Sequence, residues 1–427
     1  MSRTVARAAG PLWGSASVPG DKSIGHRALL LGALAEGTLN VRGLSDGQDV
    51  RSTRSCLEAL GVRFEEGGRF LAVHGAGAAG LKAPARALDC GNSGSTMRFL
   101  MGVLAGQPFE SELTGDASLS RRPMERVAAP LRAMGADITL SEGHAPVRLR
   151  GRRPLKGASY RLPVASAQVK TALLLAGLYA DGETTVEDPF GTRDHTELML
   201  AFLGADCRSD DGRVTVRPGA LRSGKAMTVP GDPSSAAFLA AAAVLVPGSR
   251  LIIREVLLNP TRLGFFEALR EMGAPVSWER GGLHGREVVG DVTAAHGRLK
   301  PCWLDAARVP GLVDEVPLLA VLCAFADGES RLEGLAELRV KESDRLAGTA
   351  AALTALGASA RVDGDALVVA GPARWRPGRV ETLGDHRLAM ASAVAALAGA
   401  GPVELSDADC AAVSYPSFFD DVKGLGA

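Results

Sequence analysis

Two stretches of sequence, VPGDKSIGHRALLLGALAEG at residues 18–37 and VPGDPSSAAFLAAAAVLVPG at residues 229–248, are echoes of one another. Each has a short extended lead, a turn containing Gly and Asp, and then a run of apolar residues that reads as a helix. Looser copies of the pattern begin at residues 88, 162, 309 and 383. Such recurrence predicts that the chain is built from repeated supersecondary units.

A second motif keeps the same period: a helix end followed by glycine and a strand-like segment. The glycines of this motif are separated by 74, 69, 69, 84 and 69 residues and are Gly61, Gly135, Gly204, Gly273, Gly357 and Gly426. Glycine after a helix is the usual left-handed cap, and the alternating residues that follow predict a strand. One such join occurs in any α/β protein, but six at near-constant spacing predict six units of about 70 residues. We therefore expect an α/β protein with two domains of three units each.

The bulk composition excludes several classes of function. The chain has 427 residues with 48 Lys and Arg against 48 Asp and Glu, so no general attraction to nucleic acid or anionic membrane is expected. The six cysteines are scattered without a C-x-x-C pair, unlike a disulfide framework or a structural zinc site. The longest apolar runs, at residues 236–246 and 172–180, are too short for a membrane span, and the N-terminal stretch does not resemble a signal peptide. We expect a cytoplasmic protein that uses neither a metal nor a cofactor.

The starts of the repeated helices carry more positive charge than a helix needs. Lys22 and Arg27 lie near the start of one helix, and Arg98 follows the small residues of GNSGSTMR at 91–98 in another. A helix N-terminus already carries about half a positive charge, so cations there oppose the dipole by some tenths of a kcal/mol. Free amides, glycine and a cation together form a ready site for phosphate or carboxylate. The sequence therefore predicts anion binding in a cleft between domains.

Further polar residues at these helix starts have a simpler explanation. Ser234 and Asp385 alone would be ordinary N-caps, worth about 1 kcal/mol each. Lys341 and Arg345, with Glu342 beside them, are equally consistent with a solvent-exposed helix laced by ion pairs. Neither a P-loop nor a G-x-G-x-x-G motif after a strand occurs, so the sequence does not predict a nucleotide site.

Taken together, the motifs resemble those of one family. In chain order they are DKSIGHRALLL, GNSGSTMR, SRRPM, ASAQVKTALLLA, TRDHTELML, LVDEVPLLA, LRVKESDRL and GDHRLAM, and they extend over nearly the whole chain. The set is similar to the 5-enolpyruvylshikimate-3-phosphate (EPSP) synthase family. The resemblance implies the two-domain enolpyruvyl transferase fold, with six βαβαββ-type repeats and helix N-termini facing the interdomain cleft. It also implies that the chain crosses between domains twice, with residues 1–20 and 229–427 in one domain and residues 21–228 in the other.

The resemblance also implies a reaction. That family transfers the enolpyruvyl group of phosphoenolpyruvate (PEP) to the 5-hydroxyl of shikimate 3-phosphate and releases phosphate, in aromatic amino-acid biosynthesis. Addition and elimination pass through a tetrahedral ketal phosphate, which requires a base for the hydroxyl and an acid for the methylene carbon. The two substrates carry about four anionic groups, so Lys and Arg must supplement the helix dipoles. Inhibition by glyphosate is expected, because Gly94 stands where some tolerant relatives carry alanine.

Individual residues acquire roles from the same resemblance. Those implied to bind shikimate 3-phosphate are Lys22, Ser23, Arg27, Ser166, Ala167, Gln168, Arg193, Asp314 and Lys341. Those implied to bind PEP are Lys22, Gly94, Arg122 and Gln168 at its phosphate, and Arg345 and Arg387 at its carboxylate. The implied catalytic residues are Asp314 as candidate base, Glu342 as the group that moves the methyl proton, and Lys22.

Two features depart from the family pattern. The C-terminal segment AAVSYPSFF at 411–419 lacks a lysine that many relatives carry there, which leaves one contact to PEP unassigned. His26 replaces a small or amide residue, and we expect it at the surface.

Three different functions stay open. UDP-N-acetylglucosamine 1-carboxyvinyltransferase shares the fold and the donor, but that family typically has Asn after the first lysine and a reactive cysteine in a loop. Here Ser23 follows Lys22, and no cysteine lies between Cys90 and Cys207. The second is a non-catalytic anion-binding relative. The third is an RNA 3′-phosphate cyclase, although neutral net charge and few aromatics disfavour an RNA groove. We expect small-molecule substrates, a monomer, and no nucleic-acid or membrane partner.

Overall fold

The chain divides into two compact units in the computed structural model, which describes residues 1–426. Unit 1 comprises residues 1–19, 230–282 and 288 onward, and unit 2 comprises residues 20–229 and 283–287. The chain therefore passes between the units at four points, after residues 19, 229, 282 and 287, whereas the family resemblance implied two. The additional pair arises because Leu283–Glu287, the turn of a hairpin, groups with unit 2.

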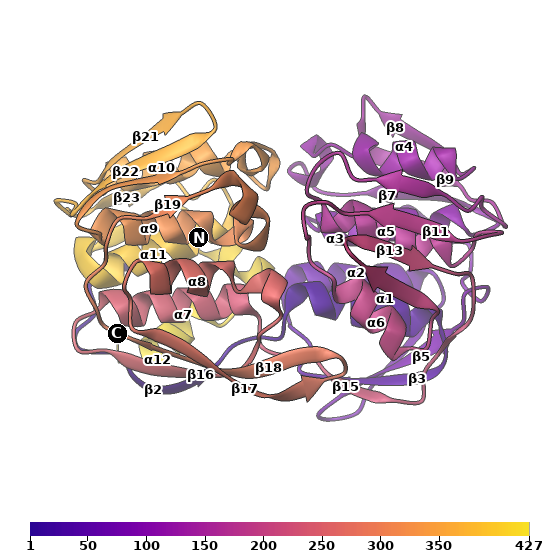
Figure 1. The fold of residues 1–427 in the computed structure, drawn as a ribbon, viewed down its shortest axis with the longest axis horizontal. Coiled ribbons are helices and arrows are strands. Elements are labelled where there is room, and N and C mark those ends of the chain that lie inside the picture. Colours follow the sequence, from indigo (N-terminus) through magenta and orange to yellow (C-terminus); the bar gives the residue numbers. More distant parts are fainter. Residues whose placement is uncertain (427) are drawn as a thin grey trace. The chain divides into compact units, whose positions relative to one another are not determined.

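Unit 2 contains three successive repeats of helices and strands (Figure 1). The first repeat consists of α1 (Lys22–Leu34), β3 (Ala35–Arg42), α2 (Gln48–Ala59), β4 (Arg63–Glu66) and β5 (Leu71–Ala76). The second consists of β6 (Leu88–Asp89), α3 (Gly94–Ala105), β7 (Glu110–Thr114), the 3₁₀ turn Leu119–Arg121, α4 (Glu125–Ala133), β8 (Asp137–Ser141) and β9 (His144–Arg150). The third consists of β10 (Ser159–Arg161), α5 (Ala167–Gly177), β11 (Thr184–Glu187), α6 (His195–Phe202), β12 (Cys207–Asp210) and β13 (Arg213–Val216).

Each repeat of unit 2 forms its own small sheet. In the third repeat, β10 runs parallel to β11, and β11 pairs antiparallel with β13, which closes a hairpin with β12. The second repeat has the equivalent order β6-β7-β9-β8. The first repeat takes its leading strand from the end of the unit, where β14 (Leu221–Arg222) and β15 (Ala226–Thr228) run parallel to β3. This strand order is that of the predicted βαβαββ unit.

Unit 1 repeats the arrangement, with the N-terminal strands completing two of its sheets. Its first repeat consists of β2 (Trp13–Ser17), α7 (Pro233–Leu245), β16 (Arg250–Leu257), α8 (Gly264–Glu271), β17 (Val276–His284) and β18 (Glu287–Ala295), with β2 parallel to β16. The second consists of β19 (Trp303–Leu304), α9 (Val316–Phe325), β20 (Gly328–Leu332), α10 (Arg345–Ala355), β21 (Ser359–Asp363) and β22 (Ala366–Gly371). The last consists of β23 (Gly378–Val380), α11 (His386–Ala395), β24 (Val403–Leu405) and α12 (Phe418–Gly424).

The last repeat departs from the predicted pattern. In place of a closing hairpin it ends in α12, and its three-stranded sheet is completed by β1 (Arg3–Val5), which pairs antiparallel with β24. The glycine motif is nevertheless regular throughout the chain. All six marker glycines have φ between +83° and +102°, which is the left-handed conformation expected of helix caps.

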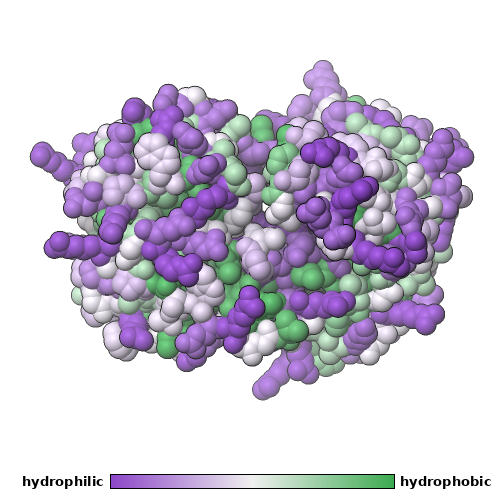
Figure 2. Space-filling view, in the orientation of Figure 1, coloured by the Kyte–Doolittle hydropathy of each residue, from purple (hydrophilic) through white to green (hydrophobic). Residues whose placement is uncertain are grey.

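The helices that carry the repeated apolar motif form the interior of each unit. Every residue of α7 and almost every residue of α1, α3 and α5 is buried, which explains why these helices have no polar face. Within unit 2, α3 packs against α5, and within unit 1, α9 packs against α11. The face drawn in Figure 2 carries many hydrophilic side chains with intermediate and hydrophobic ones between them. No helix within residues 1–426 is both long and apolar enough to span a membrane.

Candidate functional site

Three helices of unit 2 begin with residues that the sequence predicted to bind anions. The first turns of α1, α3 and α5 are each capped by a side-chain oxygen that accepts a backbone N–H: Asp21 from Ile24 (2.7 Å), Ser93 from Thr96 (3.1 Å) and Ser166 from Val169 (3.3 Å). Ala167 and Gln168 are the first two residues of α5. Capping leaves the remaining N-terminal amides of each helix available to an anion.

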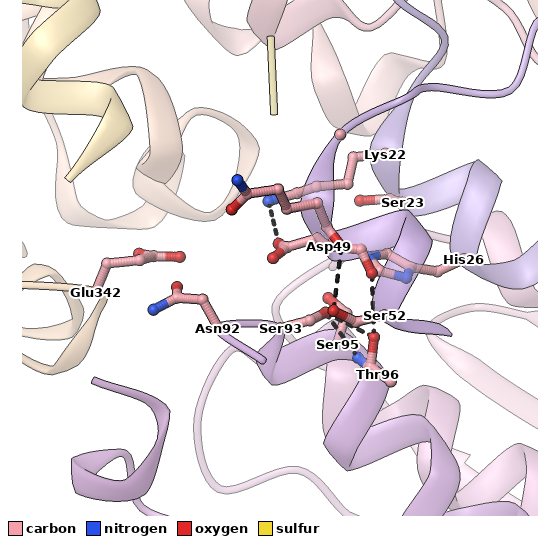
Figure 3. A network of polar contacts seen from close by, with 12 residues as sticks. Lys22, Ser23, His26, Asp49, Ser52, Asn92, Ser93, Ser95, Thr96 and Glu342 are labelled. Atoms are coloured by element: carbon pink, nitrogen blue, oxygen red, sulfur yellow. Dashed lines mark hydrogen bonds and ion pairs between the residues drawn. The ribbon is translucent and has the colours of Figure 1, made fainter. Parts of the chain in front are cut away.

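The ammonium group of Lys22 is held at the start of α1 by a carboxylate from α2. Its Nζ lies 2.9 Å from Oδ2 of Asp49, and both side chains are mostly buried (Figure 3). The neighbouring hydroxyl of Ser23 accepts a hydrogen bond from Arg193, with 3.4 Å between Oγ and Nη1. The structure therefore brings together Lys22, Ser23 and Arg193, three of the residues predicted to bind shikimate 3-phosphate.

Two guanidinium groups flank the first residue of α3. A Cβ atom placed on Gly94 would lie 2.8 Å from Nη1 of Arg98 and 3.3 Å from Nη1 of Arg122. Arg98 donates a hydrogen bond to Oε1 of Gln168 at 2.6 Å, and Arg122 donates to Oδ1 of Asn92 at 2.7 Å. Gly94, Arg122 and Gln168 thus lie near one another, and their contact with the PEP phosphate stays a prediction. Arg98 belongs to the same group, although the family motifs assigned it to neither substrate.

Arg27, which was also expected to bind substrate, is used inside unit 2. Its side chain is 3% exposed, and it donates hydrogen bonds to the hydroxyls of Thr196 and Thr171, both at 2.7 Å. Its guanidinium carbon lies 4.7 Å from the ring centroid of Phe99. Burial lowers the pKa of Arg27 to about 10. These contacts join α1 to α3, α5 and α6, and a contact of Arg27 with substrate stays a prediction.

A second cation near the start of α5 is also committed to the interior. Nζ of Lys170 lies 2.9 Å from Oδ2 of Asp188 and 2.7 Å from Oε1 of Glu197, and all three side chains are buried. Burial opposes the ammonium form, but the two adjacent carboxylates outweigh it and raise the pKa of Lys170. This triad holds the third repeat together and leaves no charge for an external anion.

In unit 1, most of the predicted catalytic residues meet around one buried guanidinium. Arg345 is 1% exposed and contacts Asp385 through Nε (2.8 Å), Asp314 through Nη1 (3.3 Å) and Glu342 through Nη2 (2.6 Å). Nζ of Lys341 lies 3.5 Å from Oδ1 of Asp314. Burial disfavours a charged guanidinium, yet the three carboxylates raise the pKa of Arg345 above its ordinary value. The alternative of a solvent-exposed helix is wrong for Arg345.

The charge balance of this group bears on its chemistry. Two cations, Lys341 and Arg345, face three carboxylates, so the group is not a simple anion site. Arg345 has five N–H donors and uses them in three carboxylate contacts, so its excess of acidic neighbours, and not a lack of donors, opposes a further anion. The carboxylates of this group outnumber its cations by one, which disfavours the binding of a further anion by this group alone.

Arg387, predicted at the PEP carboxylate, lies in the first turn of α11. Its Nη1 is 3.6 Å from Oε1 of Glu315, which also accepts a hydrogen bond from the hydroxyl of Ser234. The cap of α7 is Asp232, not Ser234, because Oδ1 of Asp232 accepts the N–H of Ser234 at 2.7 Å. Ser234 also accepts a hydrogen bond from Arg262 at 3.0 Å. Asp232 is a local partner, but Glu315 and Arg262 lie 81 and 28 residues from Ser234, so no local pattern in the sequence indicated them.

His26 is buried rather than exposed as expected. It is 1% exposed, and its Nδ1 lies 2.6 Å from Oγ1 of Thr53 on α2. The prediction was wrong because α1 is surrounded by protein on all sides, including the side on which His26 lies. Across residues 1–426, no group of three or more His, Cys, Asp or Glu side chains is arranged to hold a metal ion.

Known proteins match the chain over almost its whole length. The sequence model of the family described as EPSP synthase (3-phosphoshikimate 1-carboxyvinyltransferase) matches residues 6–422. The 3-phosphoshikimate 1-carboxyvinyltransferase of Acidithiobacillus ferrooxidans is 48% identical over 419 residues, which cover 98% of this chain and 96% of that protein.

Solved structures show the same relationship. EPSP synthase from Acinetobacter baumannii superimposes with a TM-score of 0.88 at 40% identity, covering 100% of this chain and 98% of that one. The enolpyruvyl transferase NikO from Streptomyces tendae has a TM-score of 0.80 at 22% identity, with the same coverage, and shares the fold. The predicted enolpyruvyl transferase fold is confirmed. The chain belongs to the EPSP synthase family.

Proposed function

We propose that this protein is a 3-phosphoshikimate 1-carboxyvinyltransferase, which transfers the enolpyruvyl group of PEP to the 5-hydroxyl of shikimate 3-phosphate and releases phosphate. One observation carries the proposal: most of the residues assigned from the family lie in two clusters, which also contain the unassigned residues Arg98 and Asp385. The unit 2 cluster consists of Lys22, Ser23, Gly94, Arg98, Arg122, Gln168 and Arg193. The unit 1 cluster consists of Asp314, Lys341, Glu342, Arg345 and Asp385, with Arg387 two residues after Asp385.

The unit 2 cluster is suited to binding phosphate groups. It combines cationic side chains with the amide-bearing starts of α1, α3 and α5, the two elements of an anion site. Asp49 fixes Lys22 at 2.9 Å and so holds its ammonium group in one place. We assign the phosphate of PEP to Lys22, Gly94, Arg122 and Gln168. We assign shikimate 3-phosphate to Lys22, Ser23 and Arg193, with Arg27, Ser166, Ala167 and Gln168.

The unit 1 cluster is suited to acid–base chemistry. Asp314 and Glu342 each contact Arg345, so both carboxylates are held beside a permanent positive charge. In the proposed reaction the 5-hydroxyl oxygen adds to C2 of PEP, Asp314 accepts the hydroxyl proton, and Glu342 donates a proton to C3, which becomes a methyl group. The resulting ketal phosphate then eliminates: the C2–O bond to phosphate breaks, the phosphate leaves with the proton held by Asp314, and a methyl proton returns to Glu342.

Arg345 and Arg387 are assigned to the carboxylate of PEP. Arg345 contacts three acids through one contact each, so its five N–H donors leave room for a further carboxylate oxygen. Lys341 is assigned to shikimate 3-phosphate, beside Asp314. We also propose that the protein acts as a monomer in the cytoplasm, without a nucleic-acid or membrane partner, as expected from the sequence.

Phosphate release with different acceptors tests the proposal. We expect release from PEP only when shikimate 3-phosphate is present. Release with UDP-N-acetylglucosamine in its place would favour the sister activity. Binding of both substrates without any release would favour a non-catalytic relative. The proposed function predicts that D314N and E342Q each reduce phosphate release by at least about 100-fold, the lower end of the range for losing one acid–base group.

A further inference from the structure

A buried row of polar side chains connects α1, α2 and α3 in unit 2, and part of it is visible in Figure 3. His26 Nδ1 lies 2.6 Å from Thr53 Oγ1, and Thr53 Oγ1 lies 2.6 Å from Thr96 Oγ1. Thr96 Oγ1 in turn lies 2.7 Å from Ser93 Oγ. All four side chains are at most 1% exposed. We call these residues the His26 row. Burying polar side chains in an apolar interior costs free energy unless they form hydrogen bonds. Each hydroxyl or ring proton in the row therefore takes part in a defined hydrogen bond.

The hydrogen-bond directions determine which tautomer His26 adopts. The hydroxyl of Thr96 donates to Ser93 Oγ, with the carbonyl of Asp49 at 3.4 Å as a second acceptor within reach. Thr96 has a single hydroxyl proton, so Thr53 must donate in the contact between Thr53 and Thr96. The short contact between His26 and Thr53 then receives its proton from His26 Nδ1. His26 is therefore the neutral Nδ1–H tautomer.

The surroundings of the ring agree with this assignment. Nε2 of His26 is buried and has no hydrogen-bond partner in the part of the chain that the structure describes. Burial, together with the charges of Lys22 and Arg27, lowers the pKa of His26 well below its usual range. The ring of Phe99 lies edge-on, with 6.3 Å between the centroids. A neutral ring with one directed donor is what this site accommodates.

The row ends at the helix start assigned to the PEP phosphate. Ser93 is the cap of α3, and its Oγ accepts both the backbone N–H and the hydroxyl of Thr96. Gly94, the next residue, is flanked by the guanidinium groups of Arg98 and Arg122. A shift of this cap moves the amides and the arginine that follow it.

We infer that His26 is a positioning residue for the phosphate end of PEP, acting through Thr53 and Thr96 on the cap of α3; this inference rests on the proposed function. His26 touches neither substrate in this assignment. Its effect is present in the ground state and in the transition state alike, because the phosphate is bound in both. Loss of the donor should therefore raise KM for PEP and leave kcat nearly unchanged.

A pair of amide substitutions tests the donor. In H26N the side-chain amide places an N–H near the position of Nδ1, whereas H26Q places it near the position of Nε2. We expect H26Q to raise KM for PEP about tenfold, with kcat within about twofold of wild type, for the loss of one buried hydrogen bond. We expect H26N to stay within about threefold of wild type in KM. H144Q is the matched control, since His144 belongs to β9 and contacts the carbonyl of Glu142 instead.

The outcomes separate this inference from the proposed function. Suppose that the wild-type enzyme is active. If H26Q then has the same KM for PEP as wild type, or if H26N and H26Q raise this KM equally, the role of His26 is overturned and the proposed function is not. A wild-type protein without turnover would overturn the proposed function and this role with it. Selective ¹⁵N-histidine NMR of the full chain adds a readout that needs no activity. It should show His26 as an Nδ1–H tautomer that does not titrate between about pH 5.5 and 8, and an Nε2–H tautomer would refute the inference.

Discussion

Substituting Gly94 with alanine tests how closely the two guanidinium groups approach the start of α3. The new Cβ would lie 2.8 Å from Nη1 of Arg98 and 3.3 Å from Nη1 of Arg122. The first distance is too short for a carbon contact, but both atoms are the ends of flexible side chains, so we expect these ends to move and the helix to stay. Gly94 has no positive φ, and alanine favours a helix over glycine by up to about 1 kcal/mol, so folding should not suffer.

The displacement of Arg98 sets the size of the effect. Its Nη1 donates to Oε1 of Gln168 at 2.6 Å, and a hydrogen bond from a charged group contributes about 1.5–3 kcal/mol. Losing this bond corresponds to roughly a 10- to 100-fold weaker site, which we expect to appear as a higher KM for PEP. Glyphosate should be affected more, because three atoms separate its phosphorus from its carboxyl carbon, where PEP has two. The longer molecule has less room beside an added methyl group.

The assay is phosphate release over a range of PEP and glyphosate concentrations at fixed shikimate 3-phosphate. We expect the inhibition constant of glyphosate to rise by a larger factor than KM for PEP in G94A. G182A is the matched control, because a Cβ on Gly182 meets no atom within 4 Å and its φ is ordinary. Equal factors for inhibitor and substrate, or no change in either, would refute the reasoning.

Three further predictions concern the ion pairs of unit 2. D49N removes the negative charge that holds the Lys22 ammonium group at 2.9 Å. We expect kcat/KM to fall by about 10- to 100-fold, the effect of losing one charged hydrogen bond. D46N, at an exposed site, should leave kcat/KM unchanged, and equal effects of the two substitutions in steady-state assays would contradict this prediction. K170M leaves two buried carboxylates without their cation and should lower the free energy of unfolding by about 3–5 kcal/mol in urea denaturation; unchanged stability would count against it. Burial raises the pKa of Asp188, but Lys170 and its hydrogen-bond donors outweigh burial and leave it lowered, so its stabilisation is complete above about pH 4 and is lost as pH falls through the lower folded value. The pKa of Lys170 is raised, so its contribution to the free energy of unfolding is present below about pH 10.4 and is lost as pH rises through the higher folded pKa. Urea titrations in which K170M and wild type have the same pH dependence would disprove the roles given to Asp188 and Lys170.

The repeat architecture could be predicted because it depends on local sequence patterns. Glycine at a helix end needs only its own backbone conformation, and all six marker glycines adopt it. Apolar helices with capped starts likewise depend on neighbours in sequence, as Asp21 and Ser93 illustrate. The last repeat differs because its partner strand, β1, comes from the opposite end of the chain. Nothing local to residues 403–405 specifies that pairing.

The environment of single polar residues could not be predicted in the same way. The burial of Arg27 could not be predicted, because its hydrogen-bond partners Thr171 and Thr196 lie 144 and 169 residues further along the chain. Arg345 meets Asp385 from 40 residues away, so the excess of carboxylates around it is invisible in LRVKESDRL. Such pairings depend on how the repeats pack against one another, and that packing cannot be predicted from local patterns in a single sequence. The substrate roles of the predicted site residues stay predictions.

Incubation with PEP and shikimate 3-phosphate in D₂O, followed by ³¹P and ¹H NMR, measures enolpyruvyl transfer most directly. Inorganic phosphate and the enol ether should appear in equal amounts, and deuterium should enter the vinyl carbon, because C3 of PEP is a methyl group in the tetrahedral intermediate. Phosphate without the enol ether, or an enol ether free of deuterium, would contradict transfer by addition and elimination.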